Sequence, residues 1–218
     1  MRGGYNPGRS SPARTATGWV MPVLMIALLL LAIFQPQFTS GGPIFISVKG
    51  PGAAHAPLVI SLLVGLGVGF LAQRTRFCTM GAIRDVVLIR DFHLFSGILA
   101  LVIAALIINL ILGQFKPGFA NQPIAHDHLL WNFLGMTLAG LAFALAGGCP
   151  GRQLILSGEG DGDAAVFVLG MIVGAGFAHN FAMASSPKGP GALGPAAVII
   201  GLIFCLVIGW AMRERSTT

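Results

Sequence analysis

Six long apolar stretches separated by short polar segments constrain this chain more than any other feature. Most are close to the roughly 20 residues that a helix needs to cross a hydrocarbon core of about 30 Å. Only 9% of the 218 residues are charged, against about a quarter in ordinary soluble domains. The sequence therefore predicts an all-α, polytopic transmembrane bundle with about six spans: Trp19–Phe34, Pro57–Ala72, Leu94–Leu112, Leu130–Gly147, Ala164–Phe181 and Ala196–Met212.

The net charge of +6 has a topological explanation. The basic residues lie between apolar runs without an aromatic stripe beside them, so nucleic acid is not an expected partner. With a cytoplasmic N-terminus, six spans satisfy the positive-inside rule, because ten arginines fall inside and three lysines fall outside. The inner set is Arg2, Arg9, Arg14, Arg74, Arg76, Arg84, Arg90, Arg152, Arg213 and Arg215, and the outer set is Lys49, Lys116 and Lys188. We expect a multi-pass protein of a bacterial-type inner (plasma) membrane with both termini in the cytoplasm.

The ends of the chain are polar. Residues 1–18 are rich in Gly, Pro, Ser and Arg and read as a disordered cytoplasmic tail, residues 19–212 as one membrane domain, and residues 213–218 as a second short tail. A cleaved signal peptide is the alternative interpretation of the first apolar run, with small residues at Thr39–Gly41 as the cleavage region.

Two connections differ from ordinary loops. Phe77–Asp91 reads FCTMGAIRDVVLIRD and Gly147–Asp163 reads GGCPGRQLILSGEGDGD. Each follows a span, carries one cysteine and continues into a short apolar run, and the two form a weak repeat about 71 residues apart. The runs Ile83–Ile89 and Leu154–Leu156 are too short to cross a membrane. We expect two short re-entrant helices, which are tolerated at membrane depth where they border protein or a water-filled pathway.

The second connection predicts an anion site. Pro150 suits the first position of a helix, which places Cys149 near the N-cap beside unpaired backbone N–H groups that attract anions. The helix end and Arg152 both favour a thiolate at Cys149. Cys78 follows the same logic without a proline to mark the helix start. The alternative for both cysteines is that they are small core residues, as we expect for Cys205.

Other features have plain structural interpretations. Three cysteines without CxxC spacing do not indicate a disulfide framework. Arg84 and Asp85 can be ion-paired with neighbours, and Gly65-x-x-x-Gly69 and Gly170-x-x-x-Gly174 are typical of helix packing.

Neither Gly158–Asp163 nor the chain as a whole carries a dinucleotide, calcium or nucleotide-binding motif, so no cofactor is expected. His126-Asp127-His128 is read as an interfacial polar turn rather than a metal site, and His179-Asn180 either satisfies a neighbouring helix or lines the outer pathway.

The stretches GFLAQRTRFCTMGAIRD and GGCPGRQLILSGEGDGDAAVFVLGMIVGAGFAHNF resemble the YeeE/YedE family of membrane proteins, which includes sulfur and selenium transporters. The similarity extends from about Pro22 to Ile208 and is closest to the C-terminal half of a YedE-type selenium transporter. Typical members are nearly twice as long, with two related halves. A homodimer or a second half-length membrane subunit would complete the pathway, and a cytoplasmic sulfurtransferase is a further candidate partner.

The resemblance implies a non-enzymatic subunit for uptake of a small sulfur- or selenium-containing anion, similar to thiosulfate, through a cysteine-lined central path. The residues that match the family motifs are Cys78, Cys149, Gln73, Arg74, Arg84, Asp85, Arg152 and Gln153. Two alternatives stay open: a membrane thiol protein that relays sulfane sulfur to a cytoplasmic carrier, and a structural half-subunit that does not transport.

Overall fold

The computed structural model describes residues 18–34, 56–118 and 126–212. These residues form helices and no strand beyond an isolated bridge between Ser186 and Gly189. The helices are α2 (Val20–Phe34), α3 (Leu58–Thr75), α4 (Thr79–Ile89), α5 (His93–Ile111), α6 (Leu129–Leu145), α7 (Pro150–Gly158), α8 (Gly162–Asn180) and α9 (Gly194–Ala211). The predicted tails, apart from Gly18, and the stretch Thr39–Gly41 lie outside the described residues.

The all-helical prediction is confirmed, and each of the six predicted apolar stretches overlaps one helix of 15 or more residues. Five helical segments are long and apolar enough to cross a membrane. The sixth, α2, has 15 residues and therefore rises only about 22 Å. The chain thus has five candidate spans and one shorter apolar helix among its described residues.

The internal repeat is visible in the order of helix lengths. Helices α3, α4 and α5 follow the pattern long, short, long, with 18, 11 and 19 residues. Helices α6, α7 and α8 repeat the pattern with 17, 9 and 19 residues. The repeat that the sequence predicted from two loops therefore extends over three helices on each side.

The backbone between the first long helix and the short helix is also repeated. In the first repeat Arg76 is left-handed, with φ of 51°, and the N–H of Phe77 donates to the carbonyl of Ala72 at 3.2 Å. In the second, Gly147 is left-handed, with φ of 73°, and the N–H of Gly148 donates to the carbonyl of Phe143 at 3.1 Å. This left-handed ending stops a helix while satisfying its last carbonyls. In both repeats this ending turns the chain sharply into the short helix.

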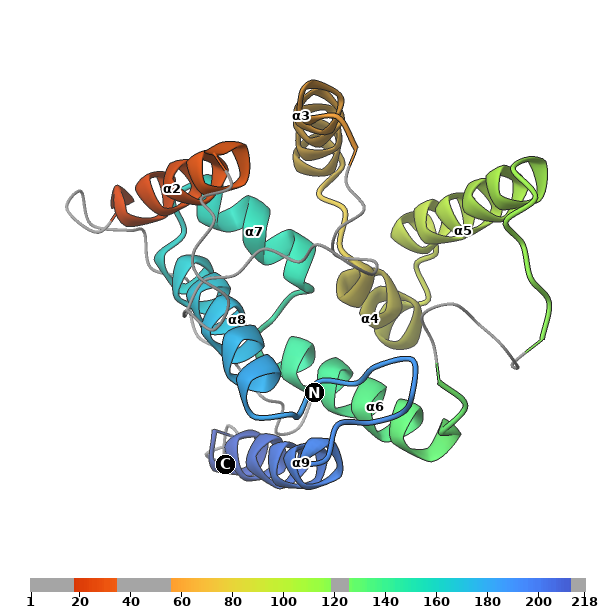
Figure 1. Cartoon of the computed structure of the whole chain (residues 1–218), viewed down its shortest axis with the longest axis vertical. Helices are drawn as coiled ribbons and strands as arrows, with labels where there is room; N and C mark the ends of the chain where they lie inside the picture. Colours follow the sequence, from red (N-terminus) through yellow and green to blue (C-terminus); the bar gives the residue numbers. More distant parts are fainter. Residues whose placement is uncertain (1–17, 35–55, 119–125, 213–218) are drawn as a thin grey trace.

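Each short helix packs within its own repeat and also contacts the other repeat. Helix α4 packs on α5 of its own repeat and contacts α6 of the other, whereas α7 packs on α8 and contacts α3. Helix α2 adds a contact to α7, and α9 packs on α6. Figure 1 shows α4 and α7 inside the arrangement of long helices, with α9 outside α6. The two short helices therefore lie toward the centre of the bundle.

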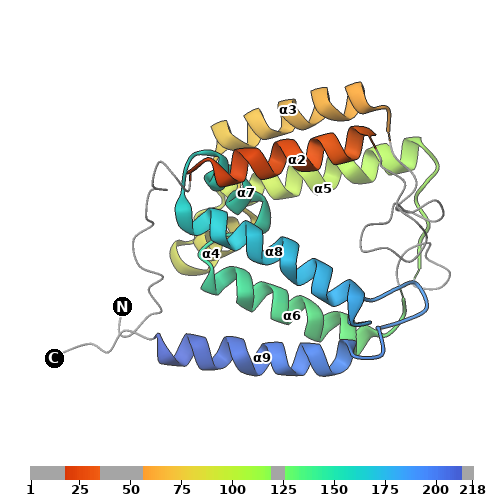
Figure 2. The same cartoon turned by 60° about the vertical axis from the view of Figure 1, so that its left-hand side comes forward.

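Both short helices lie toward one end of the bundle. Figure 2 shows α4 and α7 near the end where α3, α6 and α9 finish and where α5 and α8 begin. The connection between α8 and α9 lies at the opposite end (Figure 2). The long helices therefore alternate in direction along the chain, as helices of a multi-span protein do.

Few side chains are buried within the described chain, and α3 and α5 bury none. The packing expected of the two Gly-x-x-x-Gly motifs does not occur within the described residues: a Cβ built at Gly65, Gly69, Gly170 or Gly174 would meet no atom within 4 Å. Gly201 of α9 provides the close approach instead, because a Cβ there would lie 2.7 Å from Cδ2 of Leu138 on α6. The motif glycines of α3 face outward because α3 contacts the rest of the fold chiefly through α7.

Gly191 in the α8–α9 connection offers a test of the fold. A Cβ at this position would collide with the carbonyl oxygens of Ala182 and Ala184, the second at 2.7 Å. Backbone atoms cannot yield as a flexible side chain does, so we expect Gly191→Ala to lower the free energy of unfolding by at least about 2 kcal/mol. Thermal unfolding in detergent would measure this. Gly176→Ala, where no atom lies within 4 Å, is the control, and equal stability of the two variants would contradict the described connection.

Candidate functional site

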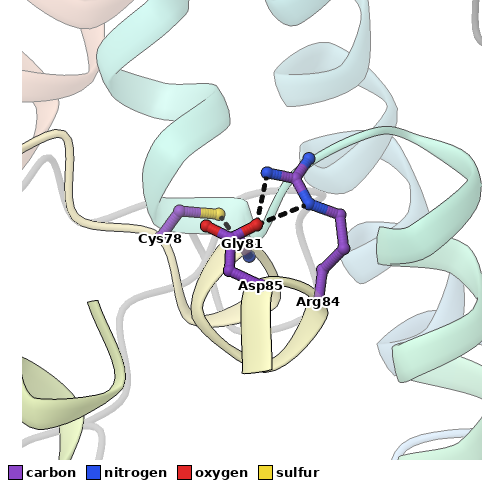
Figure 3. A network of polar contacts seen from close by, with 4 residues as sticks. All are labelled: Cys78, Gly81, Arg84 and Asp85. Carbon is purple, nitrogen blue, oxygen red and sulfur yellow. Dashed lines mark hydrogen bonds and ion pairs between the residues drawn. The ribbon is translucent and has the colours of Figure 1, made fainter. Parts of the chain in front are cut away.

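Both short helices begin at a cysteine. Cys78 is the N-cap of α4 in an extended conformation, and its Sγ accepts a hydrogen bond from the N–H of Gly81 at 3.3 Å (Figure 3). Cys149 is the N-cap of α7, and Pro150 occupies the first helical position, as the sequence predicted. The Cys149 side chain makes no capping hydrogen bond within α7. The first turn of α7 therefore keeps backbone donors and a positive partial charge for another group.

The central placement of the two short helices brings the two cysteines together. Cys78 and Thr79 of the first repeat lie close to the sulfur of Cys149 in the second repeat. Cys149 is 7% exposed, and Cys78 is half-buried. The centre of the site is thus a pair of free thiols between two helix N-termini.

Arg152 places a cation in the same first turn of α7. Its side chain is 18% exposed, and its Nη2 lies 3.8 Å from Oε2 of Glu159. Its Nη1 is buried and has no hydrogen-bond partner among the described residues. A distant ion pair with one unsatisfied guanidinium nitrogen leaves Arg152 able to bind an additional anion.

Gln153 makes a hydrogen bond at the turn that precedes α7. It is 6% exposed, and its Nε2 donates to the carbonyl of Ala146 at 3.0 Å. A Cβ at Gly148 would lie 3.2 Å from the same nitrogen. The amide therefore braces the turn that carries Cys149.

Arg84 and Asp85 pair with each other. Nε and Nη2 of Arg84 donate to the same Asp85 oxygen at 3.0 and 2.9 Å (Figure 3). The Arg84 side chain is 63% exposed and that of Asp85 is 20% exposed, which agrees with the ion-paired alternative. The remaining predicted residues, Gln73 and Arg74, are exposed in the last turn of α3, before the left-handed Arg76.

Thr79 was missed by the sequence interpretation. It is the first residue of α4, is exposed, and lies close to Cys149 of the other repeat. The available signal was the alignment of the two loops, which sets Thr79 beside Cys78 as Pro150 stands beside Cys149. The proximity of Thr79 to Cys149 emerges only when the two repeats are placed together.

The other motifs serve the scaffold. Cys205 is 9% exposed in α9, as expected of a core residue. The rings of His126 and His128 lie 5.5 Å apart, and no cluster of three metal-ligating side chains occurs in the described part of the chain. Asp161 caps α8 by accepting from the N–H of Ala164 at 3.0 Å. Asn180 donates to the carbonyl of Gly176 on its own helix at 2.8 Å.

Comparison with known proteins gives three findings. The family model described as "Sulphur transport" matches residues 74–193, which include both cysteine motifs. A thiosulfate transporter TsuA from Spirochaeta thermophila is 34% identical over 99 residues, covering 45% of this chain and 29% of that protein. The thiosulfate transporter TsuA of Escherichia coli is 29% identical over 104 residues, covering 47% and 29%. The chain thus matches less than a third of the length of either relative, and no solved structure matches.

The cysteine pair predicts a specific cross-link. Treating the purified protein with copper phenanthroline should join Cys78 to Cys149 and leave Cys205 free, because only the first two thiols interact and a disulfide requires Cβ atoms about 4 Å apart. Mass spectrometry of the digested protein would identify the linked peptides. Retention of three maleimide-reactive thiols after oxidation would contradict the described proximity.

Proposed function

Because this chain belongs to the sulphur transport family, the YeeE/YedE family expected from its motifs, we propose that it is a membrane transport subunit for a small sulfur- or selenium-containing anion. Thiosulfate is the favoured example, since both curated relatives are named thiosulfate transporters. Transport in our proposal is non-covalent: the anion passes Cys149 and Cys78 unchanged. The observation that carries this proposal is the interaction of the two cysteine thiols at the starts of α7 and α4.

The groups around the thiols suit such an anion chemically. A thiosulfate ion has negatively charged oxygens and a soft terminal sulfur. Backbone N–H groups at a helix start and the under-paired Arg152 attract the charge, while thiols make weak S–H contacts with the sulfur. Weak contacts are an advantage, because a transport site must bind its substrate well enough to admit it and loosely enough to release it.

The placement in the membrane follows from helix length and charge. Helices α4 and α7 have 11 and 9 residues and rise about 16 and 14 Å, roughly half of a hydrocarbon core. We propose that both are re-entrant and start near mid-membrane. The cysteine-bearing connections and the end of α9 lie toward the same end of the bundle (Figure 2). Because these connections carry arginines, this arrangement supports cytoplasmic termini in an inner (plasma) membrane.

A second subunit would enclose the path. The exposed apolar residues of α3 include Val59 and Leu63, whose side chains are 67% and 64% exposed. A Cβ built at Gly65, Gly67 or Gly69 would meet no atom within 4 Å. Such small residues allow close approach of another membrane helix. Since each curated relative extends well beyond its matched segment, we propose a second copy or a separate half-length subunit against α3, with lipid on the remaining apolar faces.

Thiosulfate uptake tests the proposed function. In cells or liposomes containing the chain, Cys149→Ser and Cys78→Ser should each reduce uptake of labelled thiosulfate at least about tenfold, because a serine hydroxyl is a smaller, harder partner for a terminal sulfur atom. Cys205→Ser is the matched control, since Cys205 lies in α9 away from the thiol pair, and it should transport at the wild-type rate.

Three outcomes would count against this proposal. Undiminished uptake by both cysteine variants would contradict a role for the thiols. A persulfide on Cys149 during turnover, detected by mass spectrometry, would favour sulfur relay over passage. Absence of uptake by wild-type chain that is folded and fully assembled would favour a structural half-subunit.

The assembly can be tested on α3. Gly65→Leu and Gly69→Leu should lower the fraction of dimer measured by native mass spectrometry in detergent, because the larger side chains block helix approach. Gly140→Leu on α6, also at a position with no atom within 4 Å, is the matched control and should leave the dimer fraction unchanged. A monomeric wild-type chain would contradict the homodimer and leave a separate subunit as the partner to be sought.

A further inference from the structure

Arg152 and Glu159 lie at opposite ends of α7, and each lies at the end that disfavours its charge. Arg152 is in the first turn of the helix, and Glu159 is its C-cap. A helix start carries partial positive charge and a helix end carries partial negative charge, so both side chains oppose the helix dipole. The stability of α7 therefore does not explain why these two residues are placed in this order.

The two side chains meet along one face of α7. Seven residues separate them, which is about two helical turns and a rise of about 10 Å. Nη2 of Arg152 nevertheless lies 3.8 Å from Oε2 of Glu159. A glutamate side chain is too short to bridge that rise alone. The Arg152 side chain therefore extends along the helix toward Glu159, and its guanidinium lies away from the helix start where Cys149 is the N-cap.

The pair between Arg152 and Glu159 is loose. Its distance of 3.8 Å exceeds the 2.7–2.9 Å or so of a charge-assisted hydrogen bond. Nη1 of Arg152 is buried and has no hydrogen-bond partner in the part of the chain that the structure describes, which is costly for a charged group. The Glu159 side chain is 35% exposed, so water can solvate its carboxylate when the guanidinium leaves. An anion with several oxygens can thus replace Glu159 as the partner of Arg152.

The first repeat holds its arginine differently. Each short helix carries one arginine, Arg84 in α4 and Arg152 in α7. Arg84 donates two hydrogen bonds to Asp85, at 3.0 and 2.9 Å, and is therefore well paired. The position 71 residues before Arg152 is Gly81, which has no charge. Of the two short helices, α7 is thus the one whose arginine is free to change its partner.

We propose that Glu159 is a positioning residue that acts as a resident counter-anion for Arg152 and is exchanged for the transported anion. This inference rests on the proposed transport function and adds the step by which the substrate is released. When an anion reaches the start of α7, the guanidinium leaves Glu159 and donates to the anion's oxygens. When the anion leaves, Arg152 pairs with Glu159 again. The competition keeps binding weak enough for release.

The binding test uses a double-mutant cycle on the purified protein in detergent. Glu159→Gln removes the resident charge at nearly constant shape and should lower the Kd of thiosulfate, measured by isothermal titration calorimetry, about threefold, the range of a partly exposed ion pair. Arg152→Gln should raise the Kd at least about tenfold, because a hydrogen bond from a charged group is lost. Adding Glu159→Gln to Arg152→Gln should have no further effect, since Glu159 acts through Arg152.

Asp91→Asn is the matched control for charge. Asp91 lies in the connection between α4 and α5, outside the second repeat, is exposed, and accepts from the N–H of His93 at 2.9 Å. Asparagine keeps this acceptor and removes the same unit of negative charge, so the Kd of thiosulfate should stay at the wild-type value. Equal tightening by Asp91→Asn and Glu159→Gln would show that net charge, rather than the contact with Arg152, sets the affinity, and would overturn the inference.

Uptake by liposomes separates this inference from the transport function. Glu159→Gln should lower both the KM and the Vmax for labelled thiosulfate about threefold, because a tighter site releases its substrate more slowly. The expected pattern of Kd values in a chain that takes up no thiosulfate would support the counter-anion and defeat the transport function. Normal uptake by wild type, with Kd and Vmax unchanged in Glu159→Gln, would overturn the inference and leave the transport function standing. Equal tightening by Glu159→Gln with and without Arg152 would also overturn it.

Discussion

The meeting of two helix starts is the contact on which the rest of this structure depends. Helices α4 and α7 each begin at a cysteine, and the Cys149 sulfur interacts with Cys78 and Thr79 across the boundary between the repeats. Helix starts carry partial positive charge, so two of them at close range repel unless a group of opposite polarity lies between. An anion bound between the two helix starts would offset this repulsion.

Several turns and helix contacts position the starts of α4 and α7. Left-handed residues Arg76 and Gly147 turn the chain out of α3 and α6, and the buried amide of Gln153 fixes the second turn through the carbonyl of Ala146. Helix α4 also contacts α6, and α7 contacts α3, so each short helix lies against the opposite repeat. The position of each cysteine therefore depends on both repeats, and a movement of one repeat relative to the other would change the distance between the two thiols.

Much of the fold could be predicted from the sequence because hydrophobic runs and helix-boundary residues act locally. Pro150 marked the start of α7 and correctly placed Cys149 at its N-cap, and the spacing of the two loops revealed the repeat. The contributions of Gln153 and Thr79 could not be predicted in this way. One depends on a hydrogen bond to Ala146 across a turn, the other on the relative placement of the repeats. The Gly-x-x-x-Gly motifs show a further limit of sequence patterns, because a pattern compatible with helix packing does not specify which helix is the partner.

The central claim is that Cys78 and Cys149 face one hydrated path that admits a thiosulfate-like anion. The most direct measurement is the rate at which each thiol, alone in a cysteine-free background, reacts with a charged, membrane-impermeant methanethiosulfonate in sealed vesicles. The account predicts that both thiols react and that thiosulfate, but not sulfate, slows both reactions. Reaction only with lipid-soluble reagents, or rates that thiosulfate leaves unchanged, would contradict it.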